Sequence, residues 1–329
     1  MVKKVLFKSN KKFVSNASLS LRDFYDRKDK ILILRAAGGL GDILMHRMMF
    51  EDFKKIDPNI KITLAVPPRY FDALKDHPYI DELVDNNKVD ISQFNVSYNT
   101  TSACVRYEMS MAPLSGLHRS DIWANHCGVE LTEHNMHINI DPVGLKYGQD
   151  LVRDFRKTGP VVLLCPVSAM QMKNLTDQQM EGVVTALRSR NCCVIASHIT
   201  TIPQLQKMDV PTITETNGNV HKLFGLVNAV DYVISVDTSH FHLSGGLQKP
   251  MLGIFTFADG KVYGKYYKHE LVQKHRDNGN WDCGPCYNYP ICPKSNIMFK
   301  PCLTEITVNM IVDGIDRMFK RWPPNHVIF

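Results

Sequence analysis

The chain has 329 residues, of which 44% are hydrophobic and 22% are charged. Both fractions lie near those of folded domains and exclude a largely disordered, collagen-like or disulfide-scaffold protein. The formal net charge of +6 resides in residues 1–30, which hold nine Lys or Arg and three Asp, so the rest of the chain is formally neutral. A basic balance often signals binding to nucleic acid or membranes, but here it belongs to an N-terminal extension.

The cysteines and the apolar runs predict a cytoplasmic protein. Nine cysteines are an odd number, and Cys192 and Cys193 are adjacent inside an apolar run, as expected for buried thiols in a reducing compartment. The N-terminus alternates basic and apolar residues without the apolar stretch of a signal peptide, and no run of 18 apolar residues occurs. Any membrane contact is therefore expected to be peripheral.

The first half of the chain alternates strand and helix patterns. Residues 3–14 could pair as a short hairpin before a linker. A short apolar run then predicts a strand at 31–34, a Gly-rich turn follows at 38–41, and helical spacing of apolar residues predicts a helix over 43–56. The remaining expected strands are 61–66, 82–84, 94–98 and 137–140, and the remaining expected helices are 69–75, 119–127 and 143–157.

The same alternation starts again after the turn signal Thr158-Gly159-Pro160. The expected strands are 161–165, 193–196, 232–236 and 251–255, and the expected helices are 177–190, 220–230, one from about 239, and 306–319 after an irregular Cys-rich stretch at 261–303. Strands that alternate with helices imply parallel sheets with right-handed crossovers. The predicted fold class is α/β, with two Rossmann-like domains facing across a cleft. The predicted divisions are an extension 1–30, domains 31–157 and 158–305, and a C-terminal helix within 306–329 that could cross back to the first domain.

The first candidate site is the turn Arg35-Ala-Ala-Gly38-Gly39-Leu-Gly41-Asp42, between a strand and a helix. Glycines permit close backbone approach, and a helix N-terminus attracts an anion. The spacing differs from the G-x-G-x-x-G dinucleotide fingerprint, so a nicotinamide enzyme is disfavoured. Asp42 could be only a favourable charge at the helix dipole, or it could be a general base at the carboxyl end of a parallel strand, where open α/β sheets bind ligands.

Two further candidate sites follow strands of the second half. Asp237 or Thr238 can simply cap a helix, but together with Ser239 and His242 this turn offers hydroxyls, an imidazole and backbone N–H groups that suit a diphosphate. Lys173 follows another strand and brings a compact positive charge. It could reach the same diphosphate, or it could be an ordinary solvated lysine.

These sites together resemble glycosyltransferase family 9, the ADP-heptose:lipopolysaccharide heptosyltransferase-like family, which has the GT-B fold. The resemblance runs from about Ile31 to Phe319 and departs from the family at Ser239, where Gly is usual. It rests on R-x-x-G-G-L-G-D-I-L at 35–44, P-Y-I-D-E-L-V at 78–84, S-x-x-x-x-K at 168–173 and, most specifically, A-x-D-Y-V-I-S-V-D-T-x-x-x-H-L-x-x-x-L-x-x-P at 229–250.

The resemblance implies an enzyme that transfers a sugar from a nucleotide-diphosphate sugar to a hydroxyl of a saccharide acceptor, with inversion and without a required metal cofactor. The base that activates the acceptor hydroxyl would be Asp42, in an N-terminal acceptor domain. The second domain would bind the nucleotide sugar. The residues matched to the donor diphosphate are Lys173, Ser168, Asp237, Thr238, Ser239 and His242.

The Cys-rich stretch has the spacing C-x₂-C-x₅-C-x₉-C, formed by Cys283, Cys286, Cys292 and Cys302. The first pair has the spacing of a zinc knuckle, whereas the second pair lacks it. Zinc therefore stands as one interpretation beside structural thiols or a disulfide. Similar Cys-rich segments occur in the family that the chain resembles, so the cluster indicates no special function.

The basic segment Lys261-Val-Tyr-Gly-Lys-Tyr-Tyr-Lys268 could contact nucleic acid, frame a nucleotide sugar or form a solvated loop. With the basic extension, it supports an alternative function, a GT-B enzyme that acts on a modified base in DNA. An alternative of another class is a non-catalytic protein that binds a nucleotide sugar or nucleic acid. The presence of Asp42, Lys173 and His242 disfavours this last alternative.

Overall fold

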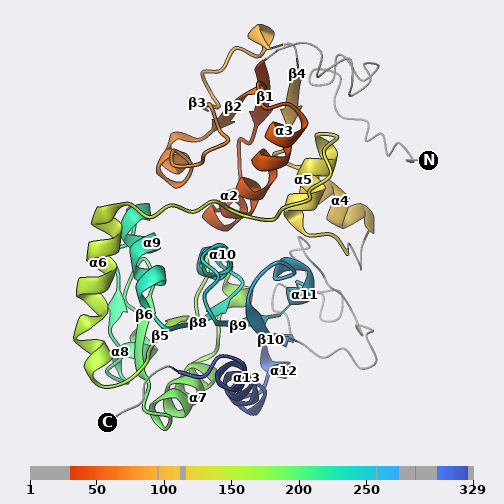
Figure 1. The fold of residues 1–329 in the computed structure, drawn as a ribbon. Helices are drawn as coiled ribbons and strands as arrows, with labels where there is room; N and C mark the ends of the chain where they lie inside the picture. The colour runs from red at the N-terminus through yellow and green to blue at the C-terminus, as the bar shows by residue number, and fades with distance from the viewer. Residues whose placement is uncertain are drawn as a thin grey trace.

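The computed structural model describes residues 30–324 except 95, 112–115, 257, 274–285 and 287–301. It contains two parallel sheets, with the first above the second in Figure 1. The α/β fold class with two Rossmann-like domains is therefore confirmed. The predicted hairpin at 3–14 lies outside the described residues, as does all of the basic extension except Lys30.

The first sheet has four parallel strands in the order β3-β2-β1-β4. Ile31 lies opposite Ile62 on one side and Val96 on the other, which sets the register of the central strand. Residues 31–34 are buried, as expected for a central parallel strand that is covered on both faces. The strands are β1 (Lys30–Leu34), β2 (Lys61–Val66), β3 (Glu82–Asp85) and β4 (Val96–Asn99).

The helices of the first domain differ from the prediction in four places, one of which is the unpredicted 3₁₀ turn η3. The helix expected over 43–56 is two α-helices joined by a 3₁₀ turn, and the helix expected over 69–75 is a 3₁₀ helix. A further helix, α4, has no counterpart among the predicted elements because its sequence has no apolar stripe of helical period. The helical elements are α2 (Leu40–His46), η1 (Arg47–Met49), α3 (Phe50–Ile56), η2 (Pro68–Ala73), η3 (Ile91–Gln93), α4 (Ala103–Met111) and α5 (Arg119–His126).

The second sheet has six parallel strands in the order β10-β9-β8-β5-β6-β7. Its strands are β5 (Val161–Cys165), β6 (Cys193–Ser197), β7 (Thr212–Ile213), β8 (Tyr232–Val236), β9 (Met251–Phe255) and β10 (His269–Gln273). Its helices are α6 (Pro142–Arg153), η4 (Phe155–Lys157), η5 (Gln171–Lys173), α7 (Asp177–Arg188), α8 (Pro203–Gln206), α9 (Val220–Ala229), α10 (Ser239–Gly246), α11 (Gly260–Tyr263), α12 (Cys302–Glu305) and α13 (Val308–Arg321).

Two expectations about local structure are wrong. The stretch from 261 begins with a helical turn and the strand β10, which pairs with β9 at the edge of the sheet. Conversely, the segment expected as a strand at 137–140 pairs with no other strand among the described residues, and it begins at His137 with a φ of +50°, outside the β region. Side chains bind its backbone instead, because Arg47 Nη2 donates to the His137 carbonyl at 2.5 Å and the Asn139 N–H donates to Asp76 at 2.8 Å.

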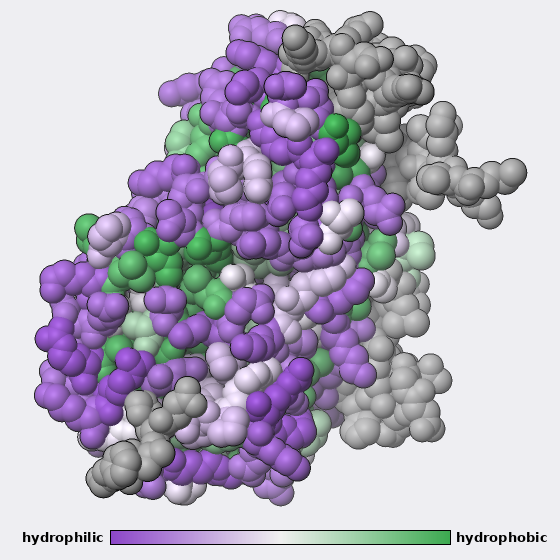
Figure 2. Space-filling view, viewed as in Figure 1, coloured by the Kyte–Doolittle hydropathy of each residue, from purple (hydrophilic) through white to green (hydrophobic). Residues whose placement is uncertain are grey.

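Helix α6 belongs with the second sheet, so the boundary predicted at residue 157 is one helix too late. Figure 1 shows α6 beside α9, and hydrophobic side chains gather over this region of the face in Figure 2. The two backbones touch through glycines, since a Cβ added to Gly148 would lie 2.0 Å from the carbonyl oxygen of Gly225. The chain therefore passes between the domains in the unpaired segment before Pro142.

Helix α13 also stays with the second domain. Its apolar face packs against α7, β9 and β10, with Ile311, Ile315 and Met318 fully buried. As far as Pro324, the last described residue, the chain does not follow the predicted return to the first domain. None of the described helices is both long and apolar enough to span a membrane.

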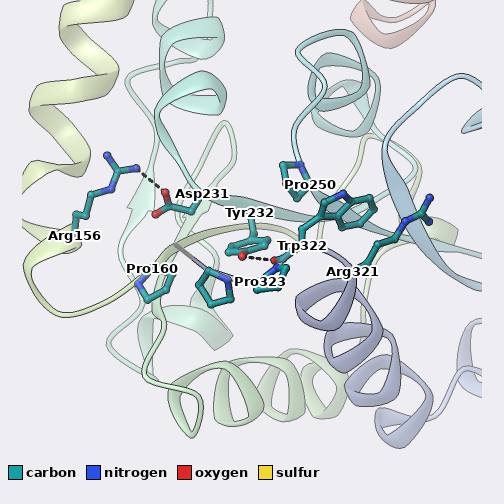
Figure 3. Close-up of a pocket in the computed structure, with 9 residues that line it drawn as sticks. Arg156, Pro160, Asp231, Tyr232, Pro250, Arg321, Trp322 and Pro323 are labelled. Atoms are coloured by element: carbon teal, nitrogen blue, oxygen red, sulfur yellow. Dashed lines mark hydrogen bonds and ion pairs between the residues drawn. The ribbon is translucent and has the colours of Figure 1, made fainter. Parts of the chain in front are cut away.

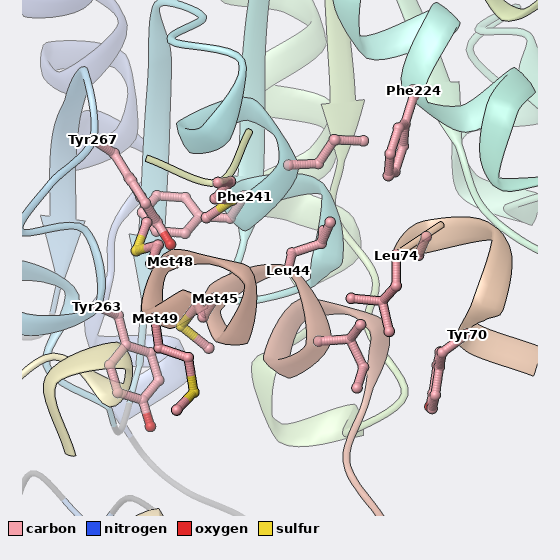
Figure 4. Packing of buried hydrophobic residues seen from close by; sticks show 14 of the residues in the cluster. Leu44, Met45, Met48, Met49, Tyr70, Leu74, Phe224, Phe241, Tyr263 and Tyr267 are labelled. Atoms are coloured by element: carbon pink, nitrogen blue, oxygen red, sulfur yellow. The ribbon is translucent and has the colours of Figure 1, made fainter. Parts of the chain in front are cut away.

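An apolar cluster runs across the junction of the two domains. Figure 4 shows Leu44 and Met45 of α2 in one buried cluster with Phe241 of α10 and with Tyr267, which precedes β10. Burial of such large side chains gives roughly 1.5–3 kcal/mol each. The two domains are therefore held in contact by shared hydrophobic packing.

Candidate functional site

The first turns of α2 and α10 contact each other across the domain junction. A Cβ added to Gly41 would lie 2.8 Å from the His242 ring and 3.4 Å from the Ser239 Cα. A larger residue at Gly41 would therefore push the helices apart. Because α2 follows β1 and α10 follows β8, the contact joins the carboxyl edges of both sheets, where parallel α/β folds bind ligands.

The Gly-rich turn before α2 places Asp42 at this junction. Gly38 has a φ of +126°, which glycine adopts readily, and its carbonyl accepts a hydrogen bond from the Tyr70 hydroxyl at 2.6 Å. The N–H of Gly39 donates to Asp42 Oδ2 at 3.1 Å. Asp42 thereby completes a capping box at the start of α2, which fixes its orientation.

Two guanidinium groups surround Asp42. Arg119 Nη1 lies 2.7 Å from Asp42 Oδ1, and Arg35 Nη2 lies 3.7 Å from Oδ2. Burial alone would raise the pKa of Asp42, but Arg119 and then Arg35 outweigh it and hold the pKa below its usual value. Asp42 is therefore ionised at neutral pH, with 20% of its side chain exposed, and can accept a proton.

Arg119 is shared between two carboxylates. Its Nε and Nη2 donate to Glu108 at 2.8 and 2.9 Å, while its Nη1 donates to Asp42. Glu108 lies on α4 and is only 1% exposed. A buried carboxylate is costly unless paired, and this fork of hydrogen bonds satisfies both oxygens.

In the second domain, Lys173 and His242 surround Asp237. Lys173 Nζ lies 2.6 Å from one Asp237 oxygen, and His242 Nε2 lies 3.6 Å from the other. Burial would raise the pKa of Asp237, but Lys173 and His242 lower it well below its ordinary value. The predicted residues Lys173, Asp237 and His242 thus lie together at the carboxyl edge of the sheet.

The hydroxyl residues predicted around this group take different positions. Thr238 is the N-cap of α10, but its side chain makes no capping hydrogen bond, so the first-turn N–H groups are not capped by it. Ser239 begins α10 against Gly41. Ser168 donates its hydroxyl hydrogen bond to the Met170 carbonyl at 3.0 Å, within its own loop. Its hydroxyl therefore supports the loop that carries Lys173.

His240 differs from His242 although both lie in the same turn. The His240 ring lies 3.1 Å from the Ser197 hydroxyl, at the end of β6. Burial lowers the pKa of His240 to about 4, with His198 adding to the effect, so this ring is neutral at neutral pH. By contrast, His242 lies beside Asp237 and within 3.1 Å of the Tyr267 hydroxyl.

The chain was compared with known proteins by sequence and by structure. No protein-family model matches the chain, and no curated protein matches it by sequence. A glycosyl transferase family 9 structure from Veillonella parvula has a TM-score of 0.66 and 13% identity, covering 89% of this chain and 97% of that one. Escherichia coli ADP-heptose LPS heptosyltransferase II has a TM-score of 0.62 and 12% identity, covering 89% and 99%. Escherichia coli heptosyltransferase WaaC with ADP has a TM-score of 0.56 and 12% identity, covering 88% and 99%.

The chain has the GT-B fold of these glycosyltransferases. At 12–13% identity the likeness establishes the fold alone. The structural resemblance to family 9 heptosyltransferases extends over about nine-tenths of the chain, as the sequence motifs predicted.

A cavity of about 540 Å³ lies at the opposite edge of the second GT-B sheet. Figure 3 shows Asp231 paired with Arg156, and the Tyr232 hydroxyl bonded to the Trp322 carbonyl. Pro160, Asp231 and Pro250 immediately precede β5, β8 and β9, so this cavity faces the amino ends of the strands. It is therefore separate from the site between the domains.

The four cysteines of the predicted Cys cluster are only partly covered by the described residues. Cys283 and Cys292 lie outside the described residues, while Cys286 is half-buried and Cys302 is buried. Among the described residues, no group of three metal-ligating side chains occurs.

The basic Tyr-rich segment is not a solvated loop, because Tyr263 and Tyr267 are only 4% and 8% exposed. These two rings are packed in the domain junction and cannot stack on nucleic-acid bases.

Except for Arg35, the residues that surround Asp42 are not indicated by the sequence motifs. Arg119 begins an expected helix and belongs to none of the motifs, yet it pairs with Asp42 and Glu108. Glu108 belongs to no motif, and Tyr263 belongs only to the basic segment 261–268, yet Tyr263 donates to Glu108 Oε1 at 3.2 Å. These residues come together because α4, α5 and α11 pack against one another, and no local spacing in the sequence predicts that packing.

Proposed function

We propose that the protein is an inverting glycosyltransferase that moves a sugar from a nucleotide-diphosphate sugar to a hydroxyl of a saccharide acceptor. One observation carries this proposal: the contact between α2 and α10 brings an ionised carboxylate of one domain close to a lysine and a histidine of the other. These are Asp42 on one side, and Lys173 with His242 on the other. Glycosyl transfer needs a base for the acceptor and positive charge for the leaving diphosphate.

The proposed step is a single displacement. The acceptor oxygen forms a bond to the anomeric carbon while the bond from that carbon to the diphosphate oxygen breaks. Asp42 takes the acceptor proton, and the nucleoside diphosphate leaves with the electron pair of the broken bond. Lys173, His242 and the N–H groups at the start of α10 stabilise the charge that develops on the diphosphate, so the proposed step needs no divalent metal.

The donor is tested by thermal-shift screening with ADP-, GDP-, UDP- and CMP-sugars. ADP-heptose is the first to test, because the WaaC structure contains ADP and a further neighbour, the Escherichia coli heptosyltransferase TibC, contains ADP-D-beta-D-heptose. We expect a diphosphate donor to raise the Tm and a CMP-sugar, which has one phosphate, to leave it unchanged. A binder that is neither transferred nor hydrolysed would instead support the non-catalytic alternative.

Replacing Asp42 with Asn should abolish most transfer while retaining donor binding. A general base contributes about 10²- to 10⁴-fold to a rate, so kcat should fall within that range. Asp72→Asn is a matched control, because Asp72 lies in the same domain and is 61% exposed in a surface pair with Lys75. Transfer assays and donor Kd values for both variants check the assignment. Wild-type kcat in Asp42→Asn would refute the role of Asp42 as base.

The acceptor is proposed to be an anionic saccharide. Arg69 and Arg106 are exposed, and they lie on elements that follow β2 and β4, at the same sheet edge as Asp42. Neither has a carboxylate partner among the described residues, whereas Arg119 is occupied by two. Exposed guanidinium groups suit phosphate or carboxylate recognition.

Cytoplasmic residence is part of the proposal, supported by the buried Cys104, Cys127 and Cys165 thiols.

A further inference from the structure

The segment from Tyr263 to Tyr267 connects the second domain to both halves of the candidate site. Tyr267 donates to or accepts from His242 Nδ1 at 3.1 Å, within the second domain. Tyr263 crosses to the first domain, where its hydroxyl donates to Glu108 Oε1 at 3.2 Å. Its ring also lies under Arg119, with the guanidinium carbon 5.0 Å from the ring centroid.

The contacts of Tyr263 continue to Asp42 through two buried side chains. Glu108 binds Arg119 through two hydrogen bonds, and the remaining Nη1 of Arg119 binds Asp42 at 2.7 Å. Arg119 is 14% exposed and Glu108 is 1% exposed, so water competes little for these bonds. A displacement of Glu108 would therefore move Arg119 and the carboxylate that it orients.

We infer that Tyr263 and Glu108 are positioning residues that fix Asp42 through Arg119, and that this arrangement is completed only when the two domains are in contact. The inference rests on the proposed role of Asp42 as base. Of the four residues in this series of contacts, Tyr263 is the one that comes from the second domain, which also holds the proposed donor site. Domain contact and base orientation are thus coupled by one hydroxyl.

The sharing of Arg119 has a chemical consequence. If Glu108 did not offset its charge, Arg119 would act on Asp42 alone and hold the pKa of Asp42 still lower. A weaker base accepts the acceptor proton less readily. Glu108 therefore orients Arg119 and also preserves the basicity of Asp42.

A second tyrosine provides a matched control. The Tyr266 hydroxyl donates to Asp121 Oδ2 at 2.7 Å, and its ring stacks on His134 with centroids 3.4 Å apart. This bond also joins the domains, since Asp121 lies on α5. However, Asp121 pairs with His134, and none of the contacts that we describe leads from it to Asp42.

The experiment compares Tyr263→Phe with Tyr266→Phe in the full chain. Each substitution removes one hydroxyl and keeps the ring. We expect Tyr263→Phe to lower kcat about fivefold to tenfold with the donor KM within twofold of wild type, because an aligned base acts after binding. Tyr266→Phe should keep kcat within twofold. Equal losses in both variants, or wild-type kcat in Tyr263→Phe, would overturn the inference.

Glu108→Gln supplies an independent readout. It should lower kcat and move the acidic limb of the kcat/KM profile to lower pH, because the Arg119 charge is no longer offset. Adding Tyr263→Phe to Glu108→Gln should cost no further activity, because the hydroxyl acts through the carboxylate. A full additional loss, or an acidic limb that moves to higher pH, contradicts the inference.

The two failures can be told apart. If no nucleotide sugar is turned over by the wild type, the proposed function falls, and if Asp42→Asn is fully active, the assignment of Asp42 as base falls. In either case the inference falls with it. If the wild type is active and Asp42→Asn is not, a Tyr263→Phe enzyme with wild-type kcat refutes the inference alone. Circular dichroism of each variant confirms that it is folded before kinetics are measured.

Discussion

Asp237 shows how one residue links the site to stability. Its carboxylate is buried, yet Lys173 and His242 keep it ionised by lowering its pKa. An unfolded Asp has a pKa of about 3.9, above the folded value. Its ionised form therefore stabilises the fold at pH values above about 4, and this stabilisation is lost as the pH falls through the folded pKa.

Lys173→Gln tests this linkage. Removal of one partner from a buried pair costs about 3 kcal/mol, so the Tm of the variant should fall at pH 7. The Tm difference from wild type should shrink as the pH falls below about 4 towards the lowered folded pKa of Asp237, because protonation then removes the charge that Lys173 offsets. Thermal unfolding between pH 3 and pH 7 measures it. A difference that stays constant with pH would contradict the assignment. Donor affinity should also fall about tenfold, because Lys173 is a proposed phosphate contact.

Among the elements, α6 and α9 depend on glycine for their close packing. A Cβ on Gly225 would lie 1.8 Å from the Gly144 carbonyl oxygen, and a backbone atom cannot move aside as a flexible side chain can. Helix propensity alone would favour alanine at Gly225 by about 1 kcal/mol. The close contact with the Gly144 carbonyl should outweigh this preference, so alanine at Gly225 should destabilise the protein.

We therefore expect Gly225→Ala to destabilise the protein by about 2–3 kcal/mol, as overpacking does in other cores. Urea unfolding followed by circular dichroism measures the change in free energy of unfolding. Gly39→Ala is the control, because nothing lies within 4 Å of the added Cβ, and at an N-cap the change costs under about 1 kcal/mol. A stabilised Gly225→Ala variant would show that α6 and α9 are not packed this closely.

At the scale of the whole molecule, the positive charge and the proposed chemistry lie in different parts of the chain. Deleting residues 1–28 removes the entire net charge of +6. We expect the truncated protein to bind an anionic acceptor more weakly and with a smaller dependence on salt, because fewer charges are screened. The donor Kd should be unchanged. Isothermal titration at two salt concentrations measures both, and an equal loss for donor and acceptor would contradict this division.

Most of the fold was predictable because it is encoded locally. The strands β1, β5, β8 and β9 are short apolar runs bounded by turn residues, and these appear in the sequence without reference to the rest of the molecule. The edge strand β10 was missed because only two of its five residues, Leu271 and Val272, are apolar. It is a strand because β9 offers it hydrogen-bond partners.

The candidate site likewise contains residues that local sequence patterns predict and residues that only the packing of the domains brings together. The Gly-rich turn, Asp42, Lys173 and the turn after Asp237 could be singled out from the sequence alone, because each follows a strand within a recognisable local pattern. Only the tertiary structure decided that Arg119, Glu108 and Tyr263 join Asp42, and that α6 belongs to the second domain. The physical reason is that buried charges choose partners by proximity in space, and helices that pack through glycines carry no periodic signal of their partner.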